Sequence, residues 1–159
     1  MLIPTSLMPS LPIVIGADNP VLRAPTRKIP KVTKEIQKLI KDMETTIRAA
    51  DGLGLAAPQV GESVRLCLVR IGTRLVPLIN PEIIRRSDET ETAEEGCLSL
   101  PNIWLEITRP KSIVIRYQDV KGQEQERLLE HVDARIVQHE VDHLDGRLIV
   151  DYPIRSKAL

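Results

Sequence analysis

The chain has 159 residues, 42% of them hydrophobic and 28% charged, which is typical of one soluble globular domain and excludes a disordered chain. Lys and Arg (22) balance Asp and Glu (22), so no global charge draws the protein to nucleic acid or an anionic membrane. No segment approaches transmembrane length, and Met1–Gly16 contains no Lys or Arg, which argues against a secretory signal.

The first predicted element is a helix over Thr33–Ala50. Its apolar residues recur at helical spacing, Thr33 is a good N-cap, and Asp51 with Gly52 ends the segment. The strand-like segments that follow are Val64–Ile71, Leu75–Ile79, Ser112–Tyr117 and a hairpin through Asp119–Gly122 into Leu128.

A second helix is predicted from about Asp133 to Leu144, with Gly146 just beyond its end, and a last strand at Arg147–Tyr152. Strands and helices are segregated along the chain rather than alternating. We therefore expect an α+β fold and a single domain over residues 1–159.

The second helix contains the pattern HExxH, from His139 through Glu140 to His143. Histidines four residues apart lie one turn apart on one helix face, so both rings can bind one ion. Glu140 lies beside that face and can reach a water on the ion, which is the position of a general base. A chance match is expected in only a few chains per thousand, roughly.

A catalytic metal site of this kind needs a third protein ligand and an open position. Asp145 and Asp151 are the only acids after His143, so we expect the ligand to come from upstream. Cys97 is the candidate, because a thiolate with two imidazoles suits Zn²⁺ or Fe²⁺.

The remaining histidine and cysteine have simpler interpretations. Cys67 lies in an alternating apolar strand and is predicted to be a buried thiol, and His131 to be a surface residue. A structural metal site with Cys67 or His131 as its fourth ligand remains an alternative. It would give Glu140 no chemical role. Two cysteines are too few for a disulfide-built domain, which favours a reducing compartment.

Three segments together resemble the signature motifs of peptide deformylases. They are Gly52-Leu53-Gly54-Leu55-Ala56-Ala57-Pro58-Gln59, Glu95-Gly96-Cys97-Leu98-Ser99 and Gln138-His139-Glu140-Val141-Asp142-His143-Leu144-Asp145-Gly146. The resemblance covers roughly residues 12 to 152. It implies antiparallel sheets around a central HExxH helix, with the other helix preceding the glycine motif.

The implied activity is removal of the formyl group from the N-terminal formyl-methionine of new polypeptides. The resemblance implies that Cys97, His139 and His143 hold one Fe²⁺ or Zn²⁺ ion. A hydroxide on the ion would attack the formyl carbon while Glu140 shuttles the proton. Gln59, through its side-chain amide, and Leu98, through its backbone N–H, would donate hydrogen bonds to the developing oxyanion.

Further residues are expected to bind substrate or orient the ligands. Gly52 and Gly54 would let a peptide backbone approach as an added strand, and Leu53, Val132 and Ile136 are candidates for the methionine pocket. Core packing is the competing interpretation of these three apolar residues. The candidates for orienting the ligands or the metal helix are Glu95, Asp142 and Arg109, with Arg109 paired to Asp142.

The chain departs from the family pattern in two places. Asp133 stands where family members often have an apolar residue, and we expect it to cap the second helix. The chain also ends without room for the C-terminal helix that contacts the ribosome in cellular bacterial members. The expected partners are formylated nascent peptides, and the expected location is a bacterial or phage-infected cytoplasm, or an organelle.

Three other functions stay open. An HExxH metallopeptidase would use a third Glu, His or Asp ligand and cleave internal peptide bonds. A non-catalytic binding module would hold a structural zinc with four protein ligands and unfold on chelation. A hydrolase using Cys97 as a nucleophile would survive chelators.

Overall fold

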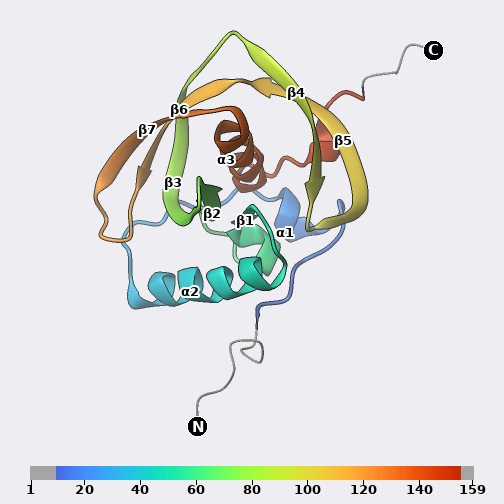
Figure 1. Cartoon of the computed structure of the whole chain (residues 1–159). Coiled ribbons are helices and arrows are strands. Elements are labelled where there is room, and N and C mark those ends of the chain that lie inside the picture. Colours follow the sequence, from blue (N-terminus) through green and yellow to red (C-terminus); the bar gives the residue numbers. More distant parts are fainter. Residues whose placement is uncertain (1–9, 155–159) are drawn as a thin grey trace, which may run out of the picture.

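The computed structural model describes residues 10–154 (Figure 1). Over this described range, seven antiparallel strands form two sheets: five strands run in the order β1-β2-β3-β6-β7, and β4 and β5 form a separate hairpin. No helix within residues 10–154 is both long and apolar enough to cross a membrane. The elements are α1 (Pro20–Arg23), α2 (Lys34–Ala49), β1 (Gly54–Ala56), the 3-10 helix η2 (Ala57–Val60), β2 (Leu66–Ile71), β3 (Arg74–Arg86), β4 (Thr90–Cys97), β5 (Leu100–Pro110), β6 (Ser112–Gln118), β7 (Glu124–Glu130), α3 (His131–Leu144) and the 3-10 helix η3 (Ile149–Asp151).

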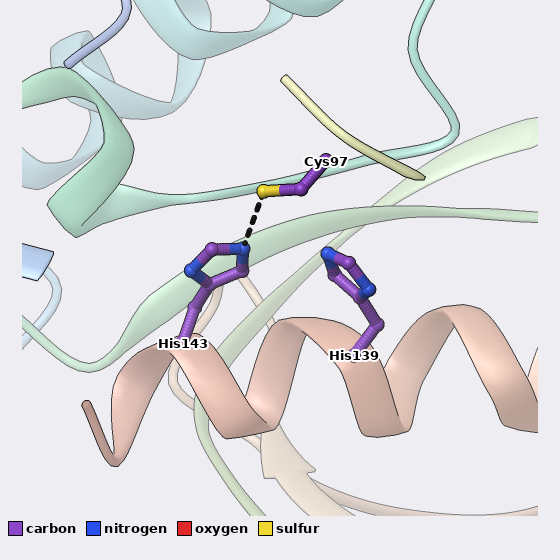
Figure 2. A group of neighbouring side chains, drawn as sticks. All are labelled: Cys97, His139 and His143. Atoms are coloured by element: carbon purple, nitrogen blue, oxygen red, sulfur yellow. Dashed lines mark hydrogen bonds between the residues drawn. The ribbon is translucent and has the colours of Figure 1, made fainter. Parts of the chain in front are cut away.

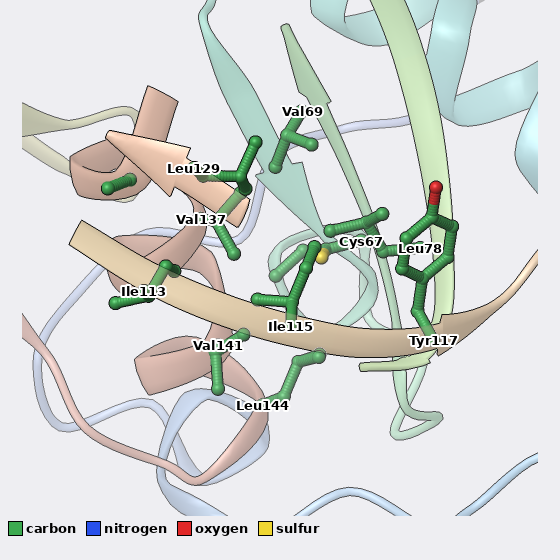
Figure 3. Packing of buried hydrophobic residues seen from close by; sticks show 12 residues of the cluster. Cys67, Val69, Leu78, Ile113, Ile115, Tyr117, Leu129, Val137, Val141 and Leu144 are labelled. Atoms are coloured by element: carbon green, nitrogen blue, oxygen red, sulfur yellow. The ribbon is translucent and has the colours of Figure 1, made fainter. Parts of the chain in front are cut away.

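Helix α3 lies at the centre, between the five-stranded sheet and the β4–β5 hairpin (Figure 1). Its apolar face buries Val137, Val141 and Leu144 against Ile113 and Ile115 of the sheet (Figure 3). Burial of each such side chain contributes about 1.5–3 kcal/mol, which fixes the helix rotation. The polar face that carries the two histidines is thereby turned toward the hairpin. The predicted α+β architecture around an HExxH helix is confirmed.

Strand β2 is buried on both faces. Leu66 and Leu68 pack into one core with α2, whereas Cys67 and Val69 pack into the other core with α3. Successive side chains of a strand point to opposite faces, so a strand between two layers needs an unbroken apolar run. Thr33 caps α2 as predicted, because its side chain accepts a hydrogen bond from the Ile36 N–H.

The β4–β5 hairpin has no counterpart among the predicted elements. Strand β4 reads TETAEEGC and is mostly exposed, so it lacks the apolar alternation that marks a strand. Its stability comes from pairing with β5 along its whole length, from Thr90 opposite Pro110 to Cys97 opposite Leu100. Strand β4 is therefore held by its backbone hydrogen bonds to β5 and by the packing of β5, and not by hydrophobic side chains of its own.

Two predictions near α3 are wrong. The last strand at Arg147–Tyr152 is instead η3, whose start is closed by a hydrogen bond from the Leu148 N–H to the Asp151 carboxylate. Helix α3 begins at His131, with Glu130 as its N-cap, so Asp133 is not the cap. Asp133 lies in the first turn, where its charge still favours the helix dipole.

The predictions about the two chain ends rest partly on residues 1–9 and 155–159. These residues lie outside the part of the chain that the structure describes.

Candidate metal centre

Cys97, His139 and His143 converge on one point, as the two distant motifs predicted (Figure 2). Cys97 ends strand β4, and the two histidines lie on successive turns of α3 with ring centroids 5.1 Å apart. One donor atom from each residue lies within 4.8 Å of the others, and the Cys97 Sγ is 3.4 Å from the His143 Nε2. Within residues 10–154, this is the group of His, Cys, Asp and Glu side chains arranged to hold an ion.

The donor set fits Zn²⁺ or Fe²⁺. A soft thiolate and two imidazoles suit both ions, and three protein ligands leave a position for water or substrate. His139 is oriented by its Nδ1, which lies 2.9 Å from the Glu95 Oε1, so its Nε2 is left for the ion. Burial holds the pKa of His143 well below its usual value, so this ring is neutral and offers a lone pair.

Two buried polar atoms at this centre, the His143 Nδ1 and the Glu140 Oε2, have no hydrogen-bond partner among residues 10–154. Burial raises the pKa of Glu140 to about 7. A carboxylate with that pKa exchanges a proton readily near neutral pH, which is the property a general acid and base requires. Its Oε1 lies 3.9 Å from the His139 Nε2, so the carboxylate stands beside the metal ligands without joining them.

Gly54 makes room for the Glu140 carboxylate. A Cβ on Gly54 would lie 2.8 Å from the Cγ and Cδ of Glu140, closer than real Cβ contacts. Gly54 was predicted to admit a substrate backbone, and the structure adds that its missing side chain leaves room for the Glu140 carboxylate. Gly52 is less constrained, because its missing Cβ would lie 3.2 Å from the Ile47 Cγ1 and from the Leu98 Cδ1.

Gln59 points its amide at the metal ligands. Its Oε1 accepts a hydrogen bond from the Ala56 N–H at 2.9 Å, which fixes the amide orientation. Its Nε2 then donates to the Ser99 Oγ at 3.1 Å and lies 3.7 Å from the Cys97 Sγ. Leu98 and Ser99 form the turn between β4 and β5, directly after the cysteine. Ser99 is fully buried, and sequence reasoning missed its role as Gln59's partner.

A buried ion-pair network lies behind His139. Arg109 donates to Glu95 through Nε at 2.7 Å and Nη2 at 2.9 Å, and its Nη1 donates to Asp142 at 2.9 Å. The expected Arg109–Asp142 pair is therefore present. Burial alone would raise the pKa of Glu95, but the hydrogen bonds from Arg109 and His139 outweigh it and bring the pKa to about 2. Glu95 is thus a fixed negative charge facing His139.

Arg135 and Tyr152 complete this network and were not predicted. Arg135 donates to the Glu95 Oε2 at 2.6 Å, and the Tyr152 hydroxyl donates to the Asp142 Oδ2 at 2.6 Å. Arg135 precedes His139 by one helical turn, so its place on the same face could have been inferred from spacing. Burial and the hydrogen bond to Asp142 raise the pKa of Tyr152, so its hydroxyl keeps its proton.

A pocket of about 850 Å³ opens onto the metal ligands. The predicted substrate residues all line it, and Leu53 and Val132 are exposed over more than half of their surface. Trp104 also lines it, and its six-membered ring occupies the space where a side chain on Gly96 would stand. The predicted set at the wall is Gly52, Leu53, Gly54, Val132 and Ile136.

The other thiol and the third histidine lie apart from the cluster. Cys67 is fully buried in the core between the sheet and α3, and burial raises the pKa of its thiol. His131 is exposed, with its Nδ1 2.7 Å from the Glu91 Oε1. Neither residue is placed to supply a fourth ligand.

Comparison with known proteins agrees with the three motifs. The family model for polypeptide deformylase matches residues 11–158. A peptide deformylase from Thermotoga petrophila is 49% identical over 141 residues, which cover 89% of this chain and 86% of the relative.

Solved structures give the same result. The crystal structure of peptide deformylase from Thermotoga maritima superimposes with a TM-score of 0.87 at 45% identity, covering 91% of this chain and 99% of that one. An Acinetobacter baumannii peptide deformylase with Met-Ala-Ser bound gives a TM-score of 0.85 at 31% identity, covering 91% of this chain and 99% of that one. From its ligand geometry, its fold and these matches, the chain belongs to the peptide deformylase family.

Proposed function

We propose that this chain hydrolyses the formyl group from the N-terminal formyl-methionine of newly made polypeptides, in a metal-dependent reaction. The observation that carries the proposal is the buried Glu140 carboxylate beside three side chains, Cys97, His139 and His143, that converge as metal ligands. Formate and a free amino terminus are the products.

Cys97, His139 and His143 would hold Fe²⁺ or Zn²⁺. An ion in such a site makes water a nucleophile at neutral pH and polarises a carbonyl oxygen. The chain's own contribution begins with orientation, because Glu95 holds the His139 ring through Nδ1 at 2.9 Å. The thiol is placed by the β4–β5 turn, where Cys97 pairs with Leu100.

Glu140 would move the proton. Its Oε2 accepts a proton from the attacking water as the bond between water oxygen and formyl carbon forms. The same oxygen then gives the proton to the amine nitrogen as the carbon–nitrogen bond breaks. Such a shuttle contributes roughly a hundredfold to ten-thousandfold in rate.

The Gln59 Nε2 and the Leu98 backbone N–H would stabilise the formyl oxygen as it becomes negative. The Gln59 amide is held at both ends, by the Ala56 N–H and by the Ser99 Oγ, so it does not have to reorganise during the reaction. A preorganised donor of this kind contributes about 3–4 kcal/mol to the transition state.

The substrate main chain would add to strand β1. Strand β1 is at the edge of the five-stranded sheet and pairs with β2 on one side, which leaves its other edge beside the pocket. Leu53, Val132 and Ile136 would surround the methionine side chain. The Acinetobacter structure with Met-Ala-Ser bound supports a peptide ligand for this pocket.

The structure gives a reason to prefer this function over an HExxH metallopeptidase. The two acids that follow His143 are both engaged elsewhere: Asp145 pairs with Arg65 at 2.8 Å, and Asp151 accepts hydrogen bonds from Arg23 and the Leu148 N–H. The third ligand comes from Cys97 instead, as in the deformylase motif.

We further propose that residues 1–159 form one catalytic domain in a cytoplasmic compartment. The family match over residues 11–158 supports the single domain. Both cysteines are free thiols, which supports a reducing environment.

The deciding experiment measures formate release from formyl-Met-Ala-Ser by the Zn²⁺- or Fe²⁺-loaded enzyme, with and without chelator. Glu140→Ala should lose most of the activity and keep its metal, whereas Glu62→Ala, at an exposed loop position, should not change it. Activity that survives chelation would instead indicate a thiol nucleophile. Cleavage of unformylated peptides at internal bonds would indicate a metallopeptidase.

A further inference from the structure

Tyr152 lies at the outer end of a chain of hydrogen bonds that ends on a metal ligand. Its hydroxyl donates to the Asp142 Oδ2 at 2.6 Å and accepts from the Arg109 Nη1 at 2.9 Å. Arg109 grips both oxygens of Glu95, and the Glu95 Oε1 lies 2.9 Å from the His139 Nδ1. Each contact is between buried or half-buried groups, so water competes weakly for the donors.

The hydroxyl satisfies two charged groups at once. The Arg109 side chain is 3% exposed, and its Nε and Nη2 both donate to Glu95. Its Nη1 donates to both Asp142 and Tyr152. Removing the hydroxyl leaves the half-buried Asp142 with one donor fewer and the buried Arg109 with one acceptor fewer. Loss of a partner from a buried charged group is costly, and the guanidinium can relieve the cost by tilting away from Glu95.

The tyrosine ring is held independently of its hydroxyl. The guanidinium carbons of Arg109 and Arg147 lie 4.9 and 3.9 Å from the ring centroid. A phenylalanine would keep both of these cation–π contacts. The Tyr152→Phe change therefore isolates the two hydrogen bonds.

The Tyr152 hydroxyl also contacts helix α3, through Asp142. Asp142 stands on α3 between His139 and His143, and its partners come from β5 (Arg109) and from the residue after η3 (Tyr152). The hydroxyl thus connects three separate elements around the two histidines. It does so from behind the ligands, because Tyr152 is not among the residues that line the 850 Å³ pocket.

We propose that Tyr152 is a positioning residue of the metal centre, which slows metal loss by holding Arg109 and Asp142 so that Glu95 fixes the His139 ring. The proposal rests on the metal-binding part of the proposed function. It assigns no contact with substrate to Tyr152, so its signature is metal retention with an unchanged KM.

The test measures the rate at which excess chelator removes Zn²⁺ from the full chain, followed with a metal-sensitive dye and requiring no substrate. Tyr152→Phe should release metal about threefold to tenfold faster than the unsubstituted chain, below the tenfold to hundredfold typical of a ligand's direct partner. The matched control is Tyr117→Phe, which removes the hydroxyl of the chain's other tyrosine, outside the network in the core between the sheet and α3. Its release rate should be unchanged.

A double-mutant cycle with Asp142→Asn tests the route. If the hydroxyl acts through Asp142 and Arg109, Tyr152→Phe should add little to the release rate in the Asp142→Asn background. The visible absorption of Co²⁺-loaded Tyr152→Phe should also shift, since the His139 ring is less well fixed.

Equal release rates for Tyr152→Phe and Tyr117→Phe would overturn the proposal, and so would effects of Tyr152 and Asp142 that simply multiply. A raised KM with normal metal release would likewise contradict it. If the unsubstituted chain binds Zn²⁺ and shows these differences but releases no formate, the proposed function fails while the role of Tyr152 stands.

Discussion

Gly54 and Glu140 are fitted to each other so closely that a single methyl group on the glycine would collide with the carboxylate side chain at 2.8 Å. The glycine lies in β1, opposite Val69 of β2, so its backbone cannot move away without breaking the sheet edge. The carboxylate must therefore yield. The glycine motif and the HExxH motif are thus packed against each other at the proposed active site.

Gly54→Ala should lower kcat by about tenfold to a hundredfold, because the displaced Glu140 Oε2 no longer meets the attacking water in line. Metal content should stay the same, since Glu140 is not a ligand. Steady-state kinetics with formyl-Met-Ala-Ser and metal analysis test this. Gly52→Ala is the comparison, and its longer contacts, 3.2 Å to Ile47 and Leu98, predict a milder loss. Full activity of Gly54→Ala would show that the Glu140 carboxylate can move aside without loss of function, which would contradict this prediction.

Gln59→Leu should reduce kcat by about a hundredfold to a thousandfold with little change in KM, because the amide acts on charge that develops only in the transition state. Ser99→Ala should have a smaller effect on kcat and should also lower the free energy of unfolding by about 1–3 kcal/mol, since a buried N–H loses its acceptor. Kinetics and urea unfolding of both variants separate the two effects. A raised KM with an unchanged kcat in Gln59→Leu would instead place the amide in ground-state binding.

Metal removal should abolish activity without unfolding the chain. The cores on the two faces of β2 are built from apolar side chains, so the fold does not depend on the ion. Chelation should leave the far-UV circular dichroism unchanged and lower Tm, and readdition of Zn²⁺ should restore both Tm and activity. Collapse of the circular dichroism on chelation would be the behaviour of a structural zinc module.

The Glu95 carboxylate should make the metal-free chain sensitive to acid. Its pKa is lowered from 4.5 to about 2, so its stabilising charge is fully present above pH 4.5 and is lost as the pH falls toward 2. That shift corresponds to about 3 kcal/mol. The free energy of unfolding of the native chain should exceed that of Glu95→Gln by about this amount at pH 6, and the difference should vanish near pH 2.

Chemical denaturation of the chelated proteins across this pH range provides the measurement. Glu94→Gln, at the exposed neighbouring position on β4, is the matched control, and its free energy of unfolding should stay close to that of the native chain. A Glu95→Gln difference that does not change with pH would mean that the native carboxylate is not stabilised by its arginines.

Trp104 should report peptide binding. It is the chain's single tryptophan, is 65% exposed and lines the pocket, so a bound peptide covers an indole that is otherwise in water. Titration of the Zn²⁺-loaded chain with Met-Ala-Ser should shift the tryptophan emission to shorter wavelength and saturate. The reversed peptide Ser-Ala-Met serves as the control. An unchanged spectrum at peptide concentrations that inhibit formate release would place the peptide away from this wall.

Local sequence patterns predicted α2, α3, the strands β2, β3 and β6, and the hairpin between β6 and β7. They did not predict the features that depend on tertiary packing. The stripe of α2 and the spacing of His139 and His143 are properties of one helix each, so they could be read without knowing the fold. Cys97 came from chemistry and motif resemblance, because no local pattern says which distant residue will meet the histidines. The β4–β5 hairpin escaped prediction because pairing, not hydrophobicity, holds β4 in place.

The missed network residues show the same limit. Arg135 stands one turn from His139 and could have been inferred, but nothing near Tyr152 in the sequence indicates that its hydroxyl meets Arg109 and Asp142. The contact between Gly54 and Glu140 could not be predicted either. A glycine in a sequence can indicate that there is no room for a side chain, but it does not indicate which neighbour fills the space. Such relationships depend on how β1 and α3 approach each other.

Strand β2 has a consequence for how the molecule opens. Leu68 and Val69 belong to opposite cores, one shared with α2 and the other with α3, so neither helix can detach without exposing a strand that the other helix also covers. The amide protons in the middles of α2 and α3 should therefore exchange with solvent through global unfolding, and hydrogen exchange should give the same free energy of opening for both helices. We therefore expect no partly open form in which α3 is folded and α2 is melted.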